Sequence, residues 1–211
     1  MKNILLTISA AAIVGLLGSC SKEPLNNLTE DESRIYISNH DSTASFNSYK
    51  TFSIVDSVSV ISNNKLEGKA VTGYDAAVID AVKSRLQQQG YTLVSKNQDP
   101  DLGINVSRIY NTYTGVVNYT DYYGSYGGYY DPYYWGYGGY GYYFPTYYGV
   151  YQIEEGALSI DALDLKNADA GKQIKGIWSV LVRGSGVFRT ENVANHIRQL
   201  FDQSDYFKAN Q

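Results

Sequence analysis

The stretch that decides the fold is TGYDAAVIDAVKSRLQQQG, residues 72–90. Thr72 and Asp75 form a capping-box pattern, in which a hydroxyl and a carboxylate satisfy free amides of the first helical turn. Gly90 stands where a helix commonly ends. Between them apolar residues recur at helical spacing, namely Val78, Ile79, Val82 and Leu86. The pattern predicts a helix over residues 75–89 with one apolar face.

Strand patterns lie on both sides of this helix, and a second helical pattern follows them. The predicted strands span 34–38, 49–55, 91–95, 102–106, 156–165 and 174–182. In the second helix, which Thr190 is expected to cap, four apolar residues share a face and His196 falls on the polar side. The order is β-β-α-β-β-(Tyr/Gly insert)-β-β-α. It predicts an α+β two-layer sandwich, in which a mixed, mostly antiparallel sheet carries both helices on one face.

Composition narrows the class of protein. The chain has 211 residues, with 17 Lys and Arg against 21 Asp and Glu, and it holds one Cys. This length suits one folded domain with appendages. One Cys excludes an internal disulfide framework, and a net charge of -4 without a basic block argues against a nucleic-acid partner.

The first residues have the pattern of an export signal. Lys2 is the only charge before an apolar run from Ile4 to Leu17, and small residues follow it. The run is shorter than the roughly 20 residues that a spanning helix needs. Residues 1–19 are therefore predicted to be a signal peptide that is removed from the mature chain.

Leu17-Gly18-Ser19-Cys20 resembles the lipobox of bacterial lipoproteins. The resemblance implies acylation of Cys20, with the lipid bilayer as a partner, and Ser21 resembles the position-two residue of lipoproteins sent to the outer membrane. The attached domain would face the periplasm or the cell surface. Residues 20–33 are polar and predict a flexible tether. The alternative is an ordinary secreted protein with a free thiol.

The remainder, predicted as one α+β domain over residues 34–207, resembles the uncharacterised lipoprotein family known as domain of unknown function 4136. The resemblance rests on residues 46–52 (FNSYKTF), Gly90-Tyr91, residues 99–102 (DPDL), residues 156–161 (GALSID) and Trp178. It implies an envelope location and this fold. It brings no established activity, catalytic residue or cofactor.

A Tyr/Gly-rich insert over residues 111–152 interrupts the domain. Seventeen of the 22 tyrosines lie between Tyr110 and Tyr151. Each Tyr offers an apolar ring face and a hydroxyl, so the insert suits contact with a glycan, a peptide or an envelope protein. We expect its contact centre at Tyr129, Tyr130, Tyr133, Tyr134 and Trp135, and we expect deletion of 115–149 to leave folding intact. There are two alternatives. The insert could be a low-complexity segment that covers the sheet, or its aromatic side chains could rest at the membrane interface.

Catalytic and metal-binding patterns are not found in the sequence. The two histidines do not stand at ligand spacing, so neither a metal nor another cofactor is predicted. Asp161 and Asp164 could support a weak hydrolase, but a spacing of three along a strand places them on opposite faces. Asp-Ser/Thr patterns at Ser42 and Ser57 resemble acceptors for O-glycans in some Gram-negative lineages.

These features together favour a cell-envelope lipoprotein of unknown biochemical activity. The leading hypothesis is a non-enzymatic binding module that uses its Tyr/Gly-rich loop. An assembly-assisting or structural outer-membrane lipoprotein is one alternative, and the weak hydrolase is the other.

Overall fold

The computed structural model describes residues 28–63, 65–110, 132–143, 156–168 and 171–209, and the backbone of 116–118 and 150–152. Ser33–Gln211 form one compact unit of the chain. The predicted signal peptide, Cys20 and most of the predicted tether lie outside the described residues.

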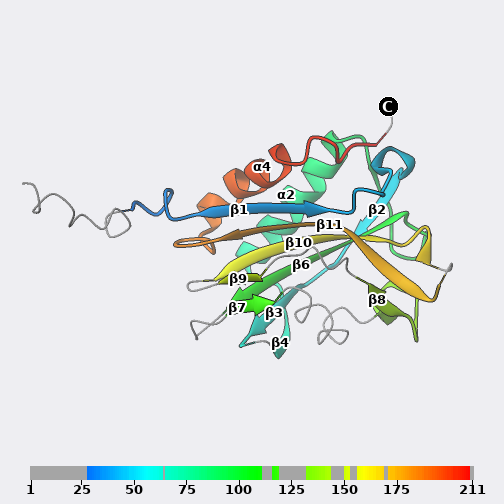
Figure 1. The fold of residues 1–211 in the computed structure, drawn as a ribbon, viewed down its shortest axis with the longest axis horizontal. Helices are drawn as coiled ribbons and strands as arrows, with labels where there is room; N and C mark the ends of the chain where they lie inside the picture. Colours follow the sequence, from blue (N-terminus) through cyan, green and yellow to red (C-terminus); the bar gives the residue numbers. More distant parts are fainter. Residues whose placement is uncertain are drawn as a thin grey trace, which may run out of the picture. The chain divides into compact units, whose positions relative to one another are not determined.

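A mixed sheet forms the centre of this unit (Figure 1). Six of its strands follow the order β1-β11-β10-β6-β2-β5, and β3, β4 and β8 extend it. Antiparallel pairs join β1 to β11, β11 to β10, β10 to β6 and β3 to β4. The strands are β1 (Ile35–His40), β2 (Thr51–Ile54), β3 (Val58–Ser62), β4 (Lys65–Ala70), β5 (Thr92–Leu93), β6 (Leu102–Tyr110), β8 (Gly141–Tyr143), β10 (Ala157–Asp164) and β11 (Gln173–Arg183). Separately, β7 (Val116–Asn118) pairs with β9 (Val150–Gln152).

Two strand positions of the sheet are each shared by two strands. Strands β2 and β3 both run parallel to β6. Strand β2 pairs with the first residues of β6, and β3 pairs with the last residues of β6. Along one edge of β11, β1 pairs with residues 178–183 and β8 with residues 173–175. The nine strands therefore occupy fewer than nine positions across the sheet. The part of the insert that forms β8 belongs to this sheet.

Helices α2 (Gly73–Gln88) and α4 (Val193–Asp202) lie on one face of the sheet (Figure 1). The predicted capping box is present, since Thr72 accepts from the Asp75 amide and Asp75 accepts from the Thr72 amide. On the sheet, Trp178 of β11 lies with its ring centroid 5.1 Å from that of Phe201 in α4. These contacts confirm the α+β sandwich with both helices on one face.

The structure differs from the sequence-based expectation in the hairpin of β3 and β4, which was not predicted. Its turn uses Asn63 at φ 47°, in the left-handed region that Asn tolerates. The β4 sequence KLEGKA is largely polar, because one side of this edge strand is exposed. A bulge beside Val60 further breaks the alternation by which a strand is recognised.

The last helix also corrects two expectations. Thr190 begins a short 3-10 turn, Thr190–Asn192, and α4 itself begins at Val193. His196 is fully buried instead of lying on a polar face. It stands one turn after Val193, on the side that faces the sheet, and its Nδ1 lies 2.8 Å from the Tyr36 hydroxyl of β1.

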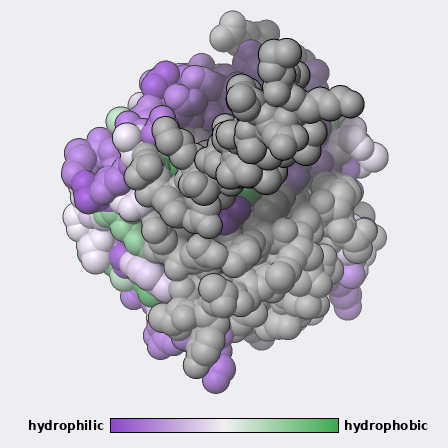
Figure 2. Space-filling model, turned by 60° about the vertical axis from the view of Figure 1, so that its left-hand side comes forward, coloured by the Kyte–Doolittle hydropathy of each residue, from purple (hydrophilic) through white to green (hydrophobic). Residues whose placement is uncertain are grey.

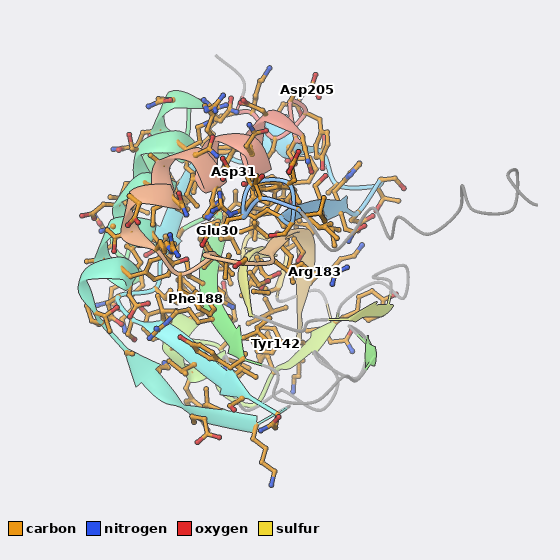
Figure 3. The ribbon with its side chains drawn as sticks, turned by 90° about the vertical axis from the view of Figure 1, so that its left-hand side faces the viewer. Glu30, Asp31, Tyr142, Arg183, Phe188 and Asp205 are labelled. Atoms are coloured by element: carbon orange, nitrogen blue, oxygen red, sulfur yellow. The ribbon has the colours of Figure 1, made fainter. Side chains whose placement is uncertain are left out.

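The two faces of the sheet differ in chemistry. On the helix side, Ile104, Ala162 and Trp178 stand opposite one another on β6, β10 and β11. On the other side, one residue along, the row is polar: Asn105, Asp161 and Ser179. All three side chains are buried. On the helix side, Phe188, which follows β11 and is labelled in Figure 3, has its ring centroid 4.7 Å from that of Tyr110 and 5.8 Å from that of Tyr74 in α2.

Candidate binding site

A polar groove lies where the loop after β1, the end of β10 and the start of β11 meet. It consists of two adjoining cavities of about 260 and 320 Å³, which share Asp164, Asn167 and Lys175. Residues between Asp41 and Tyr49 line the first cavity, and Tyr143 of β8 lines the second. We call these two cavities together the polar groove.

The buried carboxylate of Asp41 anchors one side of the groove. It forms an ion pair with Lys175, and its Oδ1 accepts from the Thr43 amide at 2.8 Å and hydroxyl at 2.7 Å. Burial opposes the charged form of Asp41, but the bonds from Lys175 and Thr43 outweigh it and hold the pKa of Asp41 below its usual value. Asp41 is therefore ionised and already paired at neutral pH.

A second carboxylate, Asp164, forms the floor between the cavities. Its Oδ2 accepts from the Tyr49 hydroxyl at 2.9 Å, and the Asn167 side-chain amide donates to both oxygens at 3.0 and 2.8 Å. Burial, followed by the neighbouring Asp164 charge, raises the pKa of Tyr49. The Tyr49 hydroxyl therefore stays protonated and acts as a donor to Asp164.

Strand pairing sets the row of side chains along this groove. Lys175 of β11 stands opposite Asp164 on one neighbour and opposite Tyr143 on the other. Residues directly opposite one another on adjacent strands project to the same face. The sheet thus places an aromatic ring, an ammonium and a carboxylate side by side.

The second candidate surface is the short 3-10 helix Pro132–Trp135, which we call the aromatic platform. Trp135 is only 5% exposed and packs on the sheet face opposite the helices, against Gly103 and Leu165. Just after it, the Tyr137 hydroxyl donates to the Leu165 carbonyl at 2.9 Å. These contacts fix the platform to the sheet.

The two tyrosines of the platform are more accessible than Trp135. Tyr134 is half-buried; its hydroxyl accepts from the Asp56 amide at 3.2 Å, and Lys96 Nζ lies 4.0 Å from its ring centroid. Burial raises the pKa of Tyr134 above its ordinary value. Tyr133 is 72% exposed, and its ring lies so close to Gly138 that position 138 has no room for a Cβ.

The structure therefore separates the five residues expected at the contact centre. Tyr133 presents its ring to solvent, Tyr134 presents part of it, and Trp135 is part of the core. Tyr129 and Tyr130 lie outside the described residues. The segment 115–149 contains the buried Trp135 and the sheet strand β8, so the structure gives a reason to expect that its deletion destabilises the fold.

The expected glycan acceptors differ in environment. Ser42 is exposed in the turn after β1, whereas Ser57 is partly buried and its hydroxyl donates to Asp56 at 3.0 Å. Asp161 and Asp164 lie on opposite faces, as the spacing predicts, because β10 pairs with β6 without interruption. The bulge between β10 and β11 leaves its extra residue, Ile177, on β11.

Sequence reasoning named Asp164 but missed its surroundings. Asp41 and Lys175 are far apart in sequence and meet because β1 and β11 are neighbours, with the Asp41 amide donating to the Ile177 carbonyl at 2.9 Å. No local pattern signals such a pair. The nearest available signal was Asn167, three residues after Asp164, a spacing typical of a side-chain bond in a turn.

Two kinds of site are absent from the described part of the chain. Among these residues, no helix combines the length and apolar character that crossing a membrane requires. Nor do they contain three or more His, Cys, Asp or Glu side chains grouped to hold a metal ion. On the face drawn in Figure 2, the described residues that can be seen are mostly hydrophilic, and hydrophobic residues reach the surface there in small areas.

The fold and the groove together define a two-layer α+β domain built on a mixed sheet. The chain belongs to the family described as "Domain of unknown function (DUF4136)", which matches residues 37–204. A crystal structure of a DUF4136 family protein from Bacteroides thetaiotaomicron has a TM-score of 0.68 at 26% identity, covering 84% of this chain and 99% of that one. The expected family is therefore confirmed.

A second solved structure is much less similar. A PelC dodecamer from Paraburkholderia phytofirmans gives a TM-score of 0.40 at 9% identity, covering 84% of this chain and 99% of that one. No curated protein matches the chain.

Proposed function

We propose that this protein is a lipid-anchored binding module of the outer membrane that catalyses no reaction. The observation that carries the proposal is the aromatic platform, in which Tyr133 is 72% exposed and lies two residues before the buried Trp135 that fixes the segment to the sheet. A rigid aromatic ring provides contact area at low entropic cost, as in binding loops rich in Tyr and Gly. The partner would be an envelope protein or a glycan.

The anchoring part of the proposal rests on the sequence. The export signal and the lipobox pattern ending at Cys20 support acylation of that residue. Two or more acyl chains, at about 0.8 kcal/mol per buried methylene, hold a folded domain on a bilayer without a spanning helix. Replacement of Cys20 by Ala should move the protein from the membrane fraction to the soluble fraction, and intact-mass analysis should show the added acyl mass only in the parent chain.

Photo-crosslinking tests the binding part directly. A photoreactive phenylalanine analogue replaces Tyr133 in the full chain, produced in its native host, and a matched control carries it at Val71, which is 63% exposed. We expect adducts with an envelope protein or glycan from position 133 and none from position 71. Adducts from neither position, with correct membrane location, would leave an assembly-assisting or structural role as the better account.

A second variant tests whether binding depends on where the aromatic ring at position 133 lies, and not only on whether a ring is present there. Gly138→Ala, combined with the photoreactive analogue at position 133, keeps an aromatic ring there but introduces a Cβ where the Tyr133 ring now lies. We expect it to reduce crosslinking of a partner to the platform while the domain stays folded, because the substitution lies on the exposed side of the segment. Unchanged crosslinking would show that the position of Tyr133 is not used.

A further inference from the structure

We propose that the polar groove is a binding site for neutral carbohydrate, with a sugar ring stacked on Tyr143 and its hydroxyls bonded by Asn167 and Gln173. The proposal deepens the proposed function, because it rests on the protein being a binding module, and it assigns a ligand class to a site separate from the aromatic platform. The groove is formed by described residues of four segments of the chain.

The charges in the groove select against ionic ligands. Asp41 and Lys175 form an ion pair, so among the described residues that line the groove no second cation balances the negative charge of Asp164. An anionic ligand would meet that carboxylate, and a cation would meet the Lys175 ammonium, which lies between the two cavities. A neutral ligand avoids both costs.

The lining also selects against apolar ligands. Hydroxyl, amide and carboxylate side chains predominate in the first cavity, and exposed polar residues form the rim of the groove: Thr43, Ser45, Ser48, Asn167 and Gln173. An apolar ligand would leave these groups without water or a partner. A molecule that donates and accepts on every side satisfies them, and polyhydroxylated sugars have this chemistry.

Two side chains on the rim have hydrogen-bonding capacity left for a ligand. The Asn167 amide nitrogen donates to Asp164, which orients the carboxamide, while its oxygen accepts no bond from the described residues. The exposed Gln173 side chain makes no hydrogen bond with those residues either. One fixed amide and one adaptable amide thus face the second cavity.

Tyr143 provides the apolar wall that a sugar ring requires. It is 46% exposed, and its position is set by the pairing of β8 with β11 opposite Lys175. Aromatic faces receive the C–H side of a ring while polar groups bond its edge. The two cavities, of about 260 and 320 Å³, share three lining residues and lie near the lower limit of the roughly 300–1,000 Å³ of ligand sites, which suits a short oligosaccharide.

Direct titration tests the proposal. The full chain, purified in detergent, is titrated with cellotriose, maltotriose and chitotriose as neutral probes and with trigalacturonate as an acidic one. Tyr143→Ala and Gln173→Ala change the groove at exposed positions, and Gln88→Ala in a distant cavity beside Arg85 is the control. We expect a neutral probe to bind, and each groove variant to weaken it about three- to tenfold, as loss of one aromatic or polar contact does.

The outcomes are distinct. Binding of none of the neutral probes at millimolar concentration, binding of trigalacturonate alone, or affinity unchanged in both groove variants would overturn the proposal. Tyr133→Ala should leave sugar affinity unchanged, because the platform lies on the other face of the sheet from the groove. Cleavage of a bound probe, seen by mass spectrometry, would support the site while refuting the non-enzymatic function. Absence of crosslinks from position 133 with sugar binding retained would refute the platform alone.

Discussion

Gly103 of β6 and Trp135 of the aromatic platform are in direct contact across the boundary between the sheet and the insert. A Cβ at position 103 would lie 3.0 Å from Trp135 Cε2 and 3.0 Å from Leu165 Cδ1. Such separations are shorter than those that Cβ atoms normally adopt, so the indole ring occupies the space that a side chain would need. One missing side chain in the middle of the sheet thus provides the place where the insert is attached.

Gly103→Ala should therefore destabilise the fold. We expect a loss of about 1–3 kcal/mol in the free energy of unfolding, the usual cost of overpacking a core. Urea unfolding followed by tryptophan fluorescence measures it. Gly73→Ala at the start of α2 is the matched control, since nothing lies within 4 Å of the position that a Cβ would take there, and it should change stability by less than about 1 kcal/mol. Equal stability of the two variants would contradict the contact.

Trp135→Ala and Tyr133→Ala should differ sharply although they are two residues apart. Removal of the buried indole should cost about 3–5 kcal/mol, whereas removal of the exposed phenol should change stability by less than about 0.5 kcal/mol. Thermal or urea unfolding distinguishes them. A small effect of Trp135→Ala would show that the insert is not part of the core.

The cap of α2 is also tied to the sheet. Asp75 is fully buried, bonds Thr72, and has its Oδ1 2.9 Å from Arg108 Nε of β6. Asp75→Ala leaves the guanidinium of Arg108 largely buried without its partner, and we expect a loss of about 3–5 kcal/mol by urea unfolding. Asp80→Ala, which breaks an exposed pair with Lys83, is the control and should cost less than about 1 kcal/mol. Similar losses would refute the buried pair.

Stability should depend on the ionisation of Asp41 at acid pH. Its pKa in the folded protein lies below the ordinary 3.8, so its contribution is complete above 3.8 and is lost as the pH falls through the folded-state pKa. The parent should therefore be more stable than Asp41→Asn near neutral pH, and the difference should shrink below 3.8. Urea unfolding at several pH values measures it. A difference that stays constant to low pH would contradict the ion pair with Lys175.

We expect O-glycan attachment at only one of the two acceptor patterns, the one at Ser42. Ser42 is exposed, whereas the Ser57 hydroxyl is engaged with Asp56, so we expect modification at Ser42 in the native host. Intact-mass analysis should show a shift that Ser42→Ala removes and Ser57→Ala keeps. The reverse pattern would show that local accessibility does not govern the site.

Local patterns predicted the elements that are amphipathic and well delimited. The capping box at Thr72 and the buried strands β10 and β11 carry their structure in their own residues, and the structure confirms them. The polar edge strand β4 and the buried His196 do not, because their environment is set by strands far away in the sequence. The same reason hid most of the groove: Asp41 and Lys175 acquire their roles only when β1 pairs with β11.

The pairing of β1 with β11 has a consequence for the order in which the chain can fold. Ile35 stands opposite Arg183, so the first strand of the unit takes its sheet position beside one of the last segments to be synthesised. A chain synthesised from its N-terminus cannot complete this edge until nearly all of it has been made. The sheet therefore stays open until late in synthesis, and during that interval its unpaired strand edges are exposed to pairing with other chains.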